Sequence, residues 1–529
     1  MTNLPPKAVV KRAVRSFATF TRVTKRKTKL SPPPLLPLTK TTPDIVFLTP
    51  DPNRLLFRFF VPGREDVGPG NSRAGTVIER IMALDDAQVQ SAIAEIDEQF
   101  PQVRDAVWRS AGEHADLVSP RIDGFADLDS DRQRLIGAAF THQFAVEGAS
   151  VCNPSMVLAP GQAANSSDGT HGTALFVMSV RGVGEGHQSS IGFRSGSIDL
   201  TGRVSLDPSN GTVQAGVHRP GVHHRRAFRR LVEDLGSDAE NAAFVVDPLG
   251  PRFDNTILEA QLTVLAAQAS TRKGTAETIA HAHAVAASSY GVHFAASTDM
   301  SERVLWPRIA IEHQGMEDAR FVRFTEDDGS VVYYATYTAF DGRSIAMQLI
   351  ETTDFADFLM TPLTGLAATG KGLALFPRRI GGRYYALTRA DRETNSLASS
   401  EDLTCWDSST PLQAPIETWE ILQLGNCGSP IETSAGWLVL THGVGAMRTY
   451  AIGAILLDLH DPSVVIGRTQ EPLIRPRPGH GGGYVPNVVY SCGGMLHGDR
   501  LVIPYGVNDQ SIAIASFSVA DVLTRLTLT

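Results

Sequence analysis

The chain has 529 residues, of which 42% are hydrophobic and 20% charged, and its formal net charge is −8. This balance excludes an intrinsically disordered protein, and the length allows several ordinary domains or one large domain built from repeats. No apolar run reaches the roughly 18 residues that a membrane-spanning helix needs, so we expect no spanning segment. The four cysteines form no CxxC pair, which predicts reduced, mostly buried thiols of a cytoplasmic protein and no metal site.

The first 30 residues form a basic arm. They contain nine cations and no acid, so the rest of the chain is more acidic than the total charge indicates. The arm lacks the continuous apolar core and the cleavage site of a secretory signal. We predict a solvated, basic and proline-rich tail over residues 1–44, with binding to an anionic membrane surface as the alternative. The acidic body argues against a nucleic-acid partner.

Two segments have the periodicity of helices. Residues 45–148 are predicted to contain a lead-in strand and then amphipathic helices, because apolar residues recur at i, i+3 and i+4 from residue 75 onward. A second helical pattern covers about 226–290. It includes His281 and His283, whose i, i+2 spacing places them on different helix faces and favours ordinary helix residues over a metal site.

One unit recurs five times in the C-terminal two-thirds of the chain. Each copy starts at a glycine and continues with an apolar strand, a polar turn and a second apolar strand. The last four copies are spaced by 53, 54 and 62 residues, close to the length of a four-stranded propeller blade with its loops. The copies start at Gly172, Gly329, Gly382, Gly436 and Gly498.

A short segment precedes each copy, and these segments also match one another. Proline occupies the same place in four of them, whereas Ala319 occupies it in the other. Proline cannot donate to a sheet ladder, so it marks the start or edge of a strand, such as the innermost strand of a blade. The segments are 153–157, 317–321, 374–379, 427–433 and 485–490, with Pro154, Pro377, Pro430 and Pro486.

These patterns predict an all-β fold, a five-bladed β-propeller over residues 149–529. The N-terminal helical region precedes it, and the helices of about 226–290 form an insertion between the first and second blades. An irregular β-sandwich is the alternative, but it gives no reason for the matched periodicity. The helical additions either close one end of the propeller channel or form a homo-oligomer interface, and their pattern leaves both open.

Polar residues concentrate at the turns that a propeller brings beside its channel. Because all five units contribute, we interpret them as the ring of a functional site rather than as surface salt bridges. The ring consists of Arg181, Glu185, Ser190, Asp341, Arg343, Arg389, Asp391, Arg392, His442, Arg448, Tyr450, Asn508 and Asp509.

The preceding segments add Asn153, Glu317, Asp318 and Arg320. An acid beside an arginine at such a place is either a structural ion pair or a general acid facing the channel. In the second case we expect confinement to raise the pKa of the acid toward neutrality. These residues alone do not separate the two readings.

A series of ordered motifs in this part of the chain closely resembles glycoside hydrolase family 130. The motifs are GMEDARF, YYATYTAFDG, KGLALFPRR, ALTRADRE, GSPIETSAGWLVLTHGV, YAIGAILLDLHDPSVVIGR, VPNVVYSCG and PYGVNDQSIAIA. The resemblance covers about 150–225 and 290–529 and implies a five-bladed propeller. It also implies the chemistry of β-mannoside phosphorylases or of inverting β-mannosidases.

The resemblance places specific roles on residues of this chain. Asp318 matches the catalytic acid that donates a proton to the glycosidic oxygen. The phosphate-binding set is matched by Arg389, His442 and Tyr450, to which we add Lys371 and Ser190. Asp509 resembles the aspartate that binds the glycone sugar, and we add Asn153, Arg181 and Asp341 to that substrate-binding set.

The resemblance predicts an inverting glycoside phosphorylase that attacks a β-linked mannoside with inorganic phosphate and releases α-mannose 1-phosphate, with no other cofactor. The alternatives are an inverting β-mannosidase with the same acid and a non-catalytic carbohydrate-binding propeller. Hydrolysis needs a second carboxylate to activate water, for which Glu185, Asp391 and Glu393 are candidates. Two departures bear on the acceptor sugar: Ala319 stands where relatives have proline, and the PGHGGG loop carries no acid.

Overall fold

The computed structural model describes residues 46–62, 73–162, 172–477 and 483–528. The chain divides into two units, 1–43 and 44–529, and every element below belongs to the second. The predicted basic tail and most of the PGHGGG loop lie outside the described residues. No described helix is long and apolar enough to cross a membrane.

The structure consists mainly of β-sheet and contains an antiparallel hairpin at each of the five places that the sequence repeat predicts. Most residues of these strands are buried, in keeping with their nearly continuous apolar sequences. The hairpins are β5 (Thr173–Val183) with β6 (Ser189–Asp199), β14 (Val331–Phe340) with β15 (Ile345–Thr352), β18 (Tyr384–Thr388) with β19 (Asn395–Ser400), β23 (Gly436–Val444) with β24 (Tyr450–Leu457), and β28 (Arg500–Val507) with β29 (Ser511–Ser518).

The first strand of each hairpin pairs with a strand from, or directly beside, the predicted preceding segment. These strands are β4 (Ser150–Leu158), β13 (Gly315–Thr325), β17 (Ala374–Leu375), β21 (Gln423–Asn426) and β26 (Val489–Tyr490). Two short strands, β22 (Ile431–Thr433) and β27 (Met495–His497), extend the fourth and fifth of these pairings. Five similar sheets therefore follow from five similar stretches of sequence.

The second strand of each hairpin pairs with an outer strand. For the first four hairpins these are β7 (Val204–Leu206), β16 (Asp357–Pro362), β20 (Ser409–Gln413) and β25 (Val465–Thr469). The last hairpin pairs instead with β1 (Val46–Leu48), in which Val46 lies opposite Ile514. Strand β30 (Leu526–Leu528) pairs with β25. These pairings join the two ends of the described chain to the same set of sheets.

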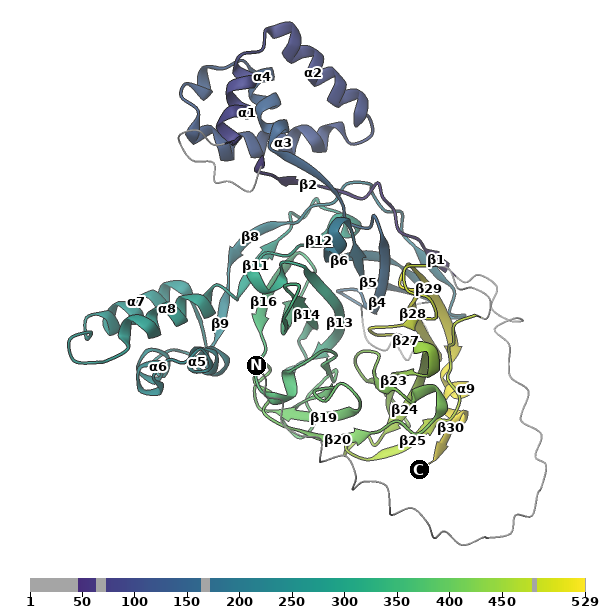
Figure 1. The fold of residues 1–529 in the computed structure, drawn as a ribbon. Coiled ribbons are helices and arrows are strands. Elements are labelled where there is room, and N and C mark those ends of the chain that lie inside the picture. The colour runs from purple at the N-terminus through teal and green to yellow at the C-terminus, as the bar shows by residue number, and fades with distance from the viewer. Residues whose placement is uncertain (1–45, 63–72, 163–171, 478–482, 529) are drawn as a thin grey trace, which may run out of the picture. The chain divides into compact units, whose positions relative to one another are not determined.

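Neighbouring sheets contact one another in cyclic order around a common centre (Figure 1): β4 contacts both β13 and β28, β14 contacts β17, β18 contacts β21, and β24 contacts β26. Apolar side chains fill the space between neighbours, as in the cluster that contains Tyr334, Leu375 and Trp406. The first two sheets are joined into one eleven-stranded sheet because Gly315 pairs in parallel with Ser189. That sheet also includes β12 (Val304–Leu305), β11 (Tyr290–His293) and β8 (Val217–Pro220).

Helices occupy both segments that have helical periodicity. The first group is α1 (Arg73–Met82), α2 (Asp86–Gln99), α3 (Arg104–Val118) and α4 (Ser130–Ala139), which share an apolar core and lie in the chain between the paired strands β2 (Leu55–Phe59) and β3 (Thr141–Ala145). Helix α2 begins after Asp85, whose side chain and that of Gln88 form a capping box.

The second group of helices consists of α5 (Arg225–Asp234), α6 (Ala239–Val246), α7 (Asn255–Ala266) and α8 (Thr275–Ala286). These four helices pack around an apolar core of their own. The ladder of β9 (Val222–His224) with β10 (Arg252–Asp254) lies beside this core. A short helix, α9 (Val519–Thr524), follows β29.

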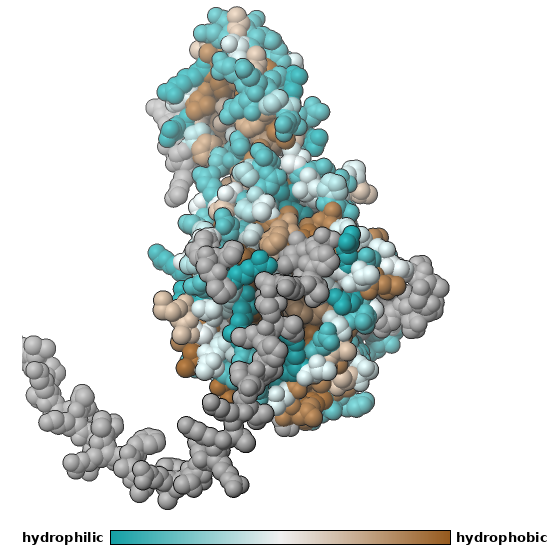
Figure 2. Space-filling view, turned by 90° about the vertical axis from the view of Figure 1, so that its right-hand side faces the viewer, coloured by the Kyte–Doolittle hydropathy of each residue, from teal (hydrophilic) through white to brown (hydrophobic). Residues whose placement is uncertain are grey.

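The distribution of hydrophobic residues on the surface and the state of the cysteines agree with what the composition predicts. On the face drawn in Figure 2, hydrophobic residues form small groups between hydrophilic ones, which is ordinary for a folded protein. All four cysteines are buried and unpaired.

Candidate active site

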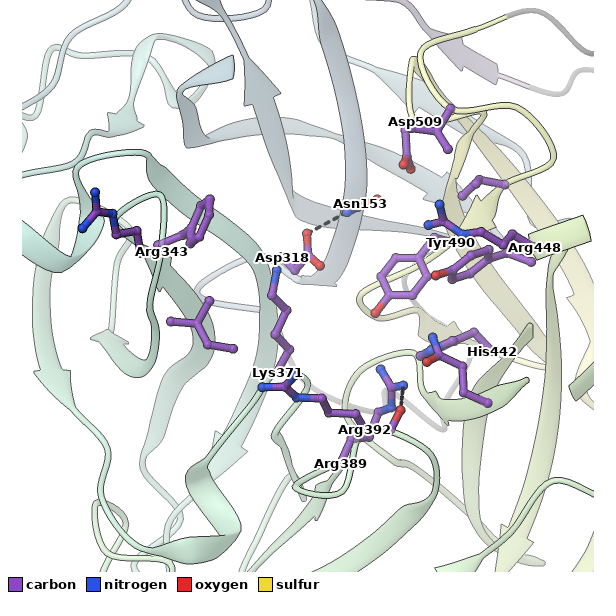
Figure 3. Close-up of a pocket in the computed structure, with 16 residues that line it drawn as sticks. Asn153, Asp318, Arg343, Lys371, Arg389, Arg392, His442, Arg448, Tyr490 and Asp509 are labelled. Carbon is purple, nitrogen blue, oxygen red and sulfur yellow. Dashed lines mark hydrogen bonds between the residues drawn. The ribbon is translucent and has the colours of Figure 1, made fainter. Parts of the chain in front are cut away.

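A cavity of about 580 Å³ opens beside the turns of the second to fifth hairpins. Each of these four turns places at least one residue in the lining of the cavity. The sheet of the first hairpin contributes Asn153, which lies on β4. The lining consists of Asn153, Asp318, Phe340, Arg343, Ile345, Lys371, Arg389, Arg392, Gln423, His442, Arg448, Tyr450, Val485, Val488, Tyr490 and Asp509 (Figure 3). Residues from 153 to 509 thus meet in one pocket.

Matching β-bulges point Asn153 and Asp318 into this cavity. The register of β4 against β5 shifts between Cys152 and Ser155, and that of β13 against β14 shifts between Glu317 and Arg320. Inside the bulges, Asn153 has a φ of 48° and Asp318 a φ of 57°. Such left-handed backbone costs a non-glycine residue about 1–3 kcal/mol, and bulges commonly re-aim a side chain beside an active site. The two bulges bring the Asn153 amide to 2.6 Å from the Asp318 carboxylate.

The Asp318 carboxylate is nearly buried, with cations around it. Arg181 lies 3.4 Å away, whereas Arg320 donates to the backbone carbonyl of Asp318 and to the Tyr490 hydroxyl. Burial acts to raise the pKa of Asp318, as the sequence predicted, but the charges of Arg181, Arg320 and Lys371 outweigh it and lower the pKa. The predicted upward shift is therefore wrong, because the sequence did not show how many cations surround the acid.

Glu317, the neighbour of Asp318, neutralises two of these cations. Its carboxylate accepts a hydrogen bond from Arg181 at 2.7 Å and another from the Lys371 ammonium. The Glu317 side chain is 9% exposed, so both ion pairs are partly shielded from water. Glu317 thus limits how strongly Arg181 and Lys371 hold Asp318 in its ionised form.

A cationic and aromatic wall lies on another side of the cavity. Arg389 is held by hydrogen bonds from its Nε to the carbonyl of Leu424 and from its Nη2 to the carbonyl of Arg392. His442 bonds through Nδ1 to the carbonyl of Asn426, and its ring lies 6.1 Å from that of Tyr450. Burial and the charges of Arg389 and Arg320 keep the pKa of His442 well below its usual value, so the imidazole is neutral.

Gly425 leaves the space that Arg389 occupies. A Cβ atom at this position would lie 2.2 Å from Cδ of Arg389 and 2.6 Å from Cε1 of His442. Any larger residue at Gly425 would therefore displace the guanidinium. The wall can bind an oxyanion through the guanidinium, the ammonium of Lys371 and the tyrosine hydroxyl groups.

Asp509 is the second carboxylate among the described residues that line the cavity. It lies in the turn between β28 and β29 with a φ of 48°. Burial and the charge of Asp318 raise its pKa to about 6, against the opposing effect of Arg181 and Arg448. The two acids thus differ in protonation at mildly acidic pH, with Asp509 retaining its proton longer.

Comparison with known proteins identifies the family. The model of glycoside hydrolase family 130, described as beta-1,4-mannooligosaccharide phosphorylase, matches residues 256–527. The 1,2-beta-oligomannan phosphorylase of Thermoanaerobacter sp. (strain X514) is 36% identical over 216 residues, which are 40% of this chain and 71% of that protein. The chain belongs to glycoside hydrolase family 130. It is an enzyme of that family, and the resemblance predicted from the motifs is confirmed.

Other mannoside phosphorylases match as well. The beta-1,2-mannobiose phosphorylase of Listeria innocua serovar 6a is 32% identical over 254 residues, which are 46% of this chain and 68% of that protein. A solved structure of beta-1,2-mannobiose phosphorylase from Listeria innocua in complex with beta-1,2-mannobiose superposes with a TM-score of 0.41 and 22% identity, covering 72% of this chain and 93% of that one.

The structure of this family 130 enzyme brings most of the predicted site residues together. Seven line the cavity: Asn153, Asp318, Lys371, Arg389, His442, Tyr450 and Asp509. Arg181 does not itself line the cavity but contacts both Glu317 and Asp318.

Two predicted residues, Ser190 and Asp341, do not line the cavity. Ser190 is buried in β6 opposite Gly182. The Asp341 carboxylate accepts from the backbone N–H groups of Arg343 and Ser344 and so shapes the exposed turn.

Sequence reasoning also left part of the cavity unassigned. Phe340, Ile345, Gln423, Val485, Val488 and Tyr490 line it without having been predicted. Tyr490 ends the fifth preceding segment, but the last residues of the other four segments do not line the cavity, so the segment pattern gave no signal for it. The others carry ordinary side chains at turns and strand ends and gave no local signal.

Proposed function

We propose that this chain is an inverting phosphorylase of β-linked mannosides that uses inorganic phosphate to release α-mannose 1-phosphate. One observation carries the proposal: a nearly buried acid, Asp318, shares one cavity with an oxyanion-binding wall formed by Arg389, Lys371 and Tyr450. A phosphorylase needs one proton donor and one phosphate site, because phosphate itself is the nucleophile. The names of the relatives point to the same chemistry.

The reaction assigns Asp318 to the leaving group. A phosphate oxygen forms a bond to the anomeric carbon while the bond from that carbon to the glycosidic oxygen breaks. The proton that the departing oxygen requires comes from Asp318, directly or through a hydroxyl of the sugar. Inversion follows because the phosphate and the leaving oxygen lie on opposite faces of the sugar.

Phosphate binding also supplies a reason for Asp318 to hold a proton. Arg181, Arg320 and Lys371 favour the ionised form of the Asp318 carboxylate. A phosphate dianion placed among these cations offsets their charge, and its own negative charge disfavours a second anion nearby. The pKa of Asp318 therefore rises when phosphate binds, so the carboxyl group is protonated when the nucleophile is in place.

The glycone sugar fits beside the remaining polar groups. Asp509 and Asn153 can accept and donate hydrogen bonds to its hydroxyl groups, while Arg181 holds Asp318 in position. Ser190 and Asp341 lie outside the cavity lining, so their contribution to binding would be indirect. Ser190 would position strand β6, and Asp341 would position the turn that carries Arg343.

A hydrolase would need a second carboxylate beside the sugar. The three candidates from the sequence do not line the cavity: Asp391 accepts hydrogen bonds within its own turn, Glu185 pairs with His142, and Glu393 lies exposed. Among the described lining residues only Asp509 would then be available as the base. Asp509 is assigned above to the hydroxyl groups of the glycone sugar, so phosphorolysis, which needs no carboxylate base, is the proposed reaction.

We also propose the architecture that fits this function, a five-bladed propeller over residues 149–529 with the helical insertion at about 226–290. It follows a tail over 1–44 and a helical region over 45–148. The cyclic contacts of the five hairpin sheets support this division.

The test is phosphate dependence. The full chain is incubated with β-1,2- and β-1,4-linked mannobiose, with and without phosphate, and the products are separated by anion-exchange chromatography. We expect sugar phosphate only when phosphate is present. Equal release of free mannose in both reactions would instead identify a hydrolase, and absence of product with every mannoside would support a binding protein. Asp318→Asn serves as the inactive control.

A further inference from the structure

The mouth of the cavity carries more positive charge than one phosphate requires. Three hairpin turns each place an exposed arginine in the lining: Arg343 between β14 and β15, Arg392 between β18 and β19, and Arg448 between β23 and β24. Among the described residues, no carboxylate lies within ion-pair distance of these three guanidinium groups. Arg181 and Lys371, by contrast, both pair with Glu317.

The three arginines do not serve the same part of the cavity. Arg392 lies beside Arg389, to which its carbonyl is hydrogen-bonded, and Arg448 lies on the side of Tyr490 and Asp509 (Figure 3). Both therefore adjoin the wall proposed to bind phosphate or the glycone. Arg343 lies on the far side of Asp318 from His442, Tyr490 and Arg448 (Figure 3). An oxyanion held on the wall is thus separated from Arg343 by the acid itself.

The proposed chemistry assigns a substrate part to that far side. In an inverting displacement the leaving group departs on the face of the sugar opposite the nucleophile. With phosphate on the wall of Arg389 and His442, the leaving sugar lies toward the turn between β14 and β15. The strand ends that flank this turn place two apolar residues, Phe340 and Ile345, in the same lining as Arg343.

The Arg343 charge is available to a ligand. The nearest acid in its turn is Asp341, whose carboxylate accepts from the backbone N–H groups of Arg343 and Ser344. Asp341 interacts with the Arg343 charge through space but forms no ion pair with it. A guanidinium beside an aromatic ring is a typical pair for binding a sugar that bears an anionic group, because the ring covers the apolar face and the guanidinium binds the oxyanion.

We propose that the leaving sugar, which is the acceptor in the synthetic direction, carries an anionic group, a phosphate monoester or a carboxylate, that binds Arg343. This inference rests on the proposed phosphorylase function and specifies its substrate class. Arg343 selects the substrate, and the neighbouring Phe340 supports the sugar ring.

The experiment measures synthesis from α-mannose 1-phosphate by the release of inorganic phosphate. The acceptors are mannose, mannose 6-phosphate and mannuronic acid, so that neutral, phosphate and carboxylate forms of one sugar are compared. We expect kcat/KM for one of the anionic acceptors to exceed that for mannose by about tenfold or more, as expected for one charge-assisted hydrogen bond. The acceptor that shows the preference identifies the anion.

Variants then locate the preference. Arg343→Gln should reduce the ratio of anionic to neutral kcat/KM by about tenfold, and Arg343→Lys should reduce it less. The control is Arg383→Gln, which removes an arginine that pairs with Glu401 outside the cavity lining and should keep the wild-type ratio. A wild-type preference for mannose, or an Arg343→Gln effect that is equal for all acceptors, would overturn the inference.

The inference and the proposed function fail in different ways. Turnover with mannose alone would retain the phosphorylase and reject the anionic acceptor. Absence of turnover with every acceptor would reject the phosphorylase. In that case, calorimetry of mannose 6-phosphate and mannuronic acid in saturating inorganic phosphate decides the inference: binding that Arg343→Gln weakens supports it, and binding that is equal in both proteins contradicts it.

Discussion

Replacing Gly425 by alanine tests the cationic wall through a residue that does not itself line the cavity. A Cβ at this position would lie 2.2 Å from Cδ and 2.4 Å from Nε of Arg389. Atoms in ordinary contact lie roughly 3.5–4.0 Å apart, so the Arg389 side chain has to move by more than about 1 Å. A misplacement of about 1 Å costs on the order of 10²-fold in catalysis, and the extra carbon costs roughly 1–3 kcal/mol of stability.

The assay is steady-state phosphorolysis with phosphate and mannoside varied separately. We expect Gly425→Ala to raise the KM for phosphate more than the KM for the mannoside, because Arg389 belongs to the wall that we propose binds phosphate. The matched control is Gly112→Ala on α3, where a Cβ meets nothing within 4 Å and the kinetics should stay unchanged. A folded Gly425→Ala enzyme with a wild-type KM for phosphate would refute the role of Arg389.

Three further predictions concern the carboxylates. Asp318→Asn keeps the bulge, since asparagine tolerates left-handed backbone, and should lower kcat by about 10²–10⁴-fold without changing the melting temperature appreciably; retained activity would remove Asp318 from its role. Glu317→Gln removes the anion that pairs with Arg181 and Lys371, so the pKa of Asp318 should fall further and the alkaline limb of the kcat–pH profile should move to lower pH. An unmoved limb would contradict this. The pKa of Asp509 is raised from 3.8 to about 6, so the folded state binds this proton more tightly than the unfolded state. Its contribution to stability is therefore lost as pH rises from about 4 to about 6, by up to about 3 kcal/mol, and urea titrations should show Asp509→Asn gaining stability relative to wild type over that range; parallel curves would argue against it.

The sequence predicted site residues correctly where the position of a side chain depends on the local backbone of its own segment. Asn153 and Asp318 stand at the same place in two matching segments, and both segments form the same bulge. The prediction was wrong where a side chain forms hydrogen bonds within its own turn instead of pointing into the cavity. Asp341 was expected in the cavity, but a carboxylate two residues before a backbone N–H can satisfy that group locally, and Arg343 lines the cavity instead.

The protonation of the site also required the structure. Two acids and several arginines could be counted from the sequence, but a pKa depends on which charges are near and on how deeply each group is buried. Arg181, 137 residues away from Asp318 along the chain, is one of the charges that hold the acid ionised. The expectation of a raised pKa for Asp318 was therefore reversed, whereas Asp509, with fewer cations beside it, has the raised value.

By itself, the sequence determined the five hairpins, the two helical segments and the membership in glycoside hydrolase family 130. These depend on periodicity, turn residues and local motifs, which neighbouring residues along the chain specify. Only the tertiary structure decided that Ser190 lies inside a sheet, that Gly425 leaves room for Arg389, and that Arg343 lies across Asp318 from the cationic wall. Each of these depends on the packing of sheets whose residues are far apart in sequence, and the sequence alone does not give the distances between them.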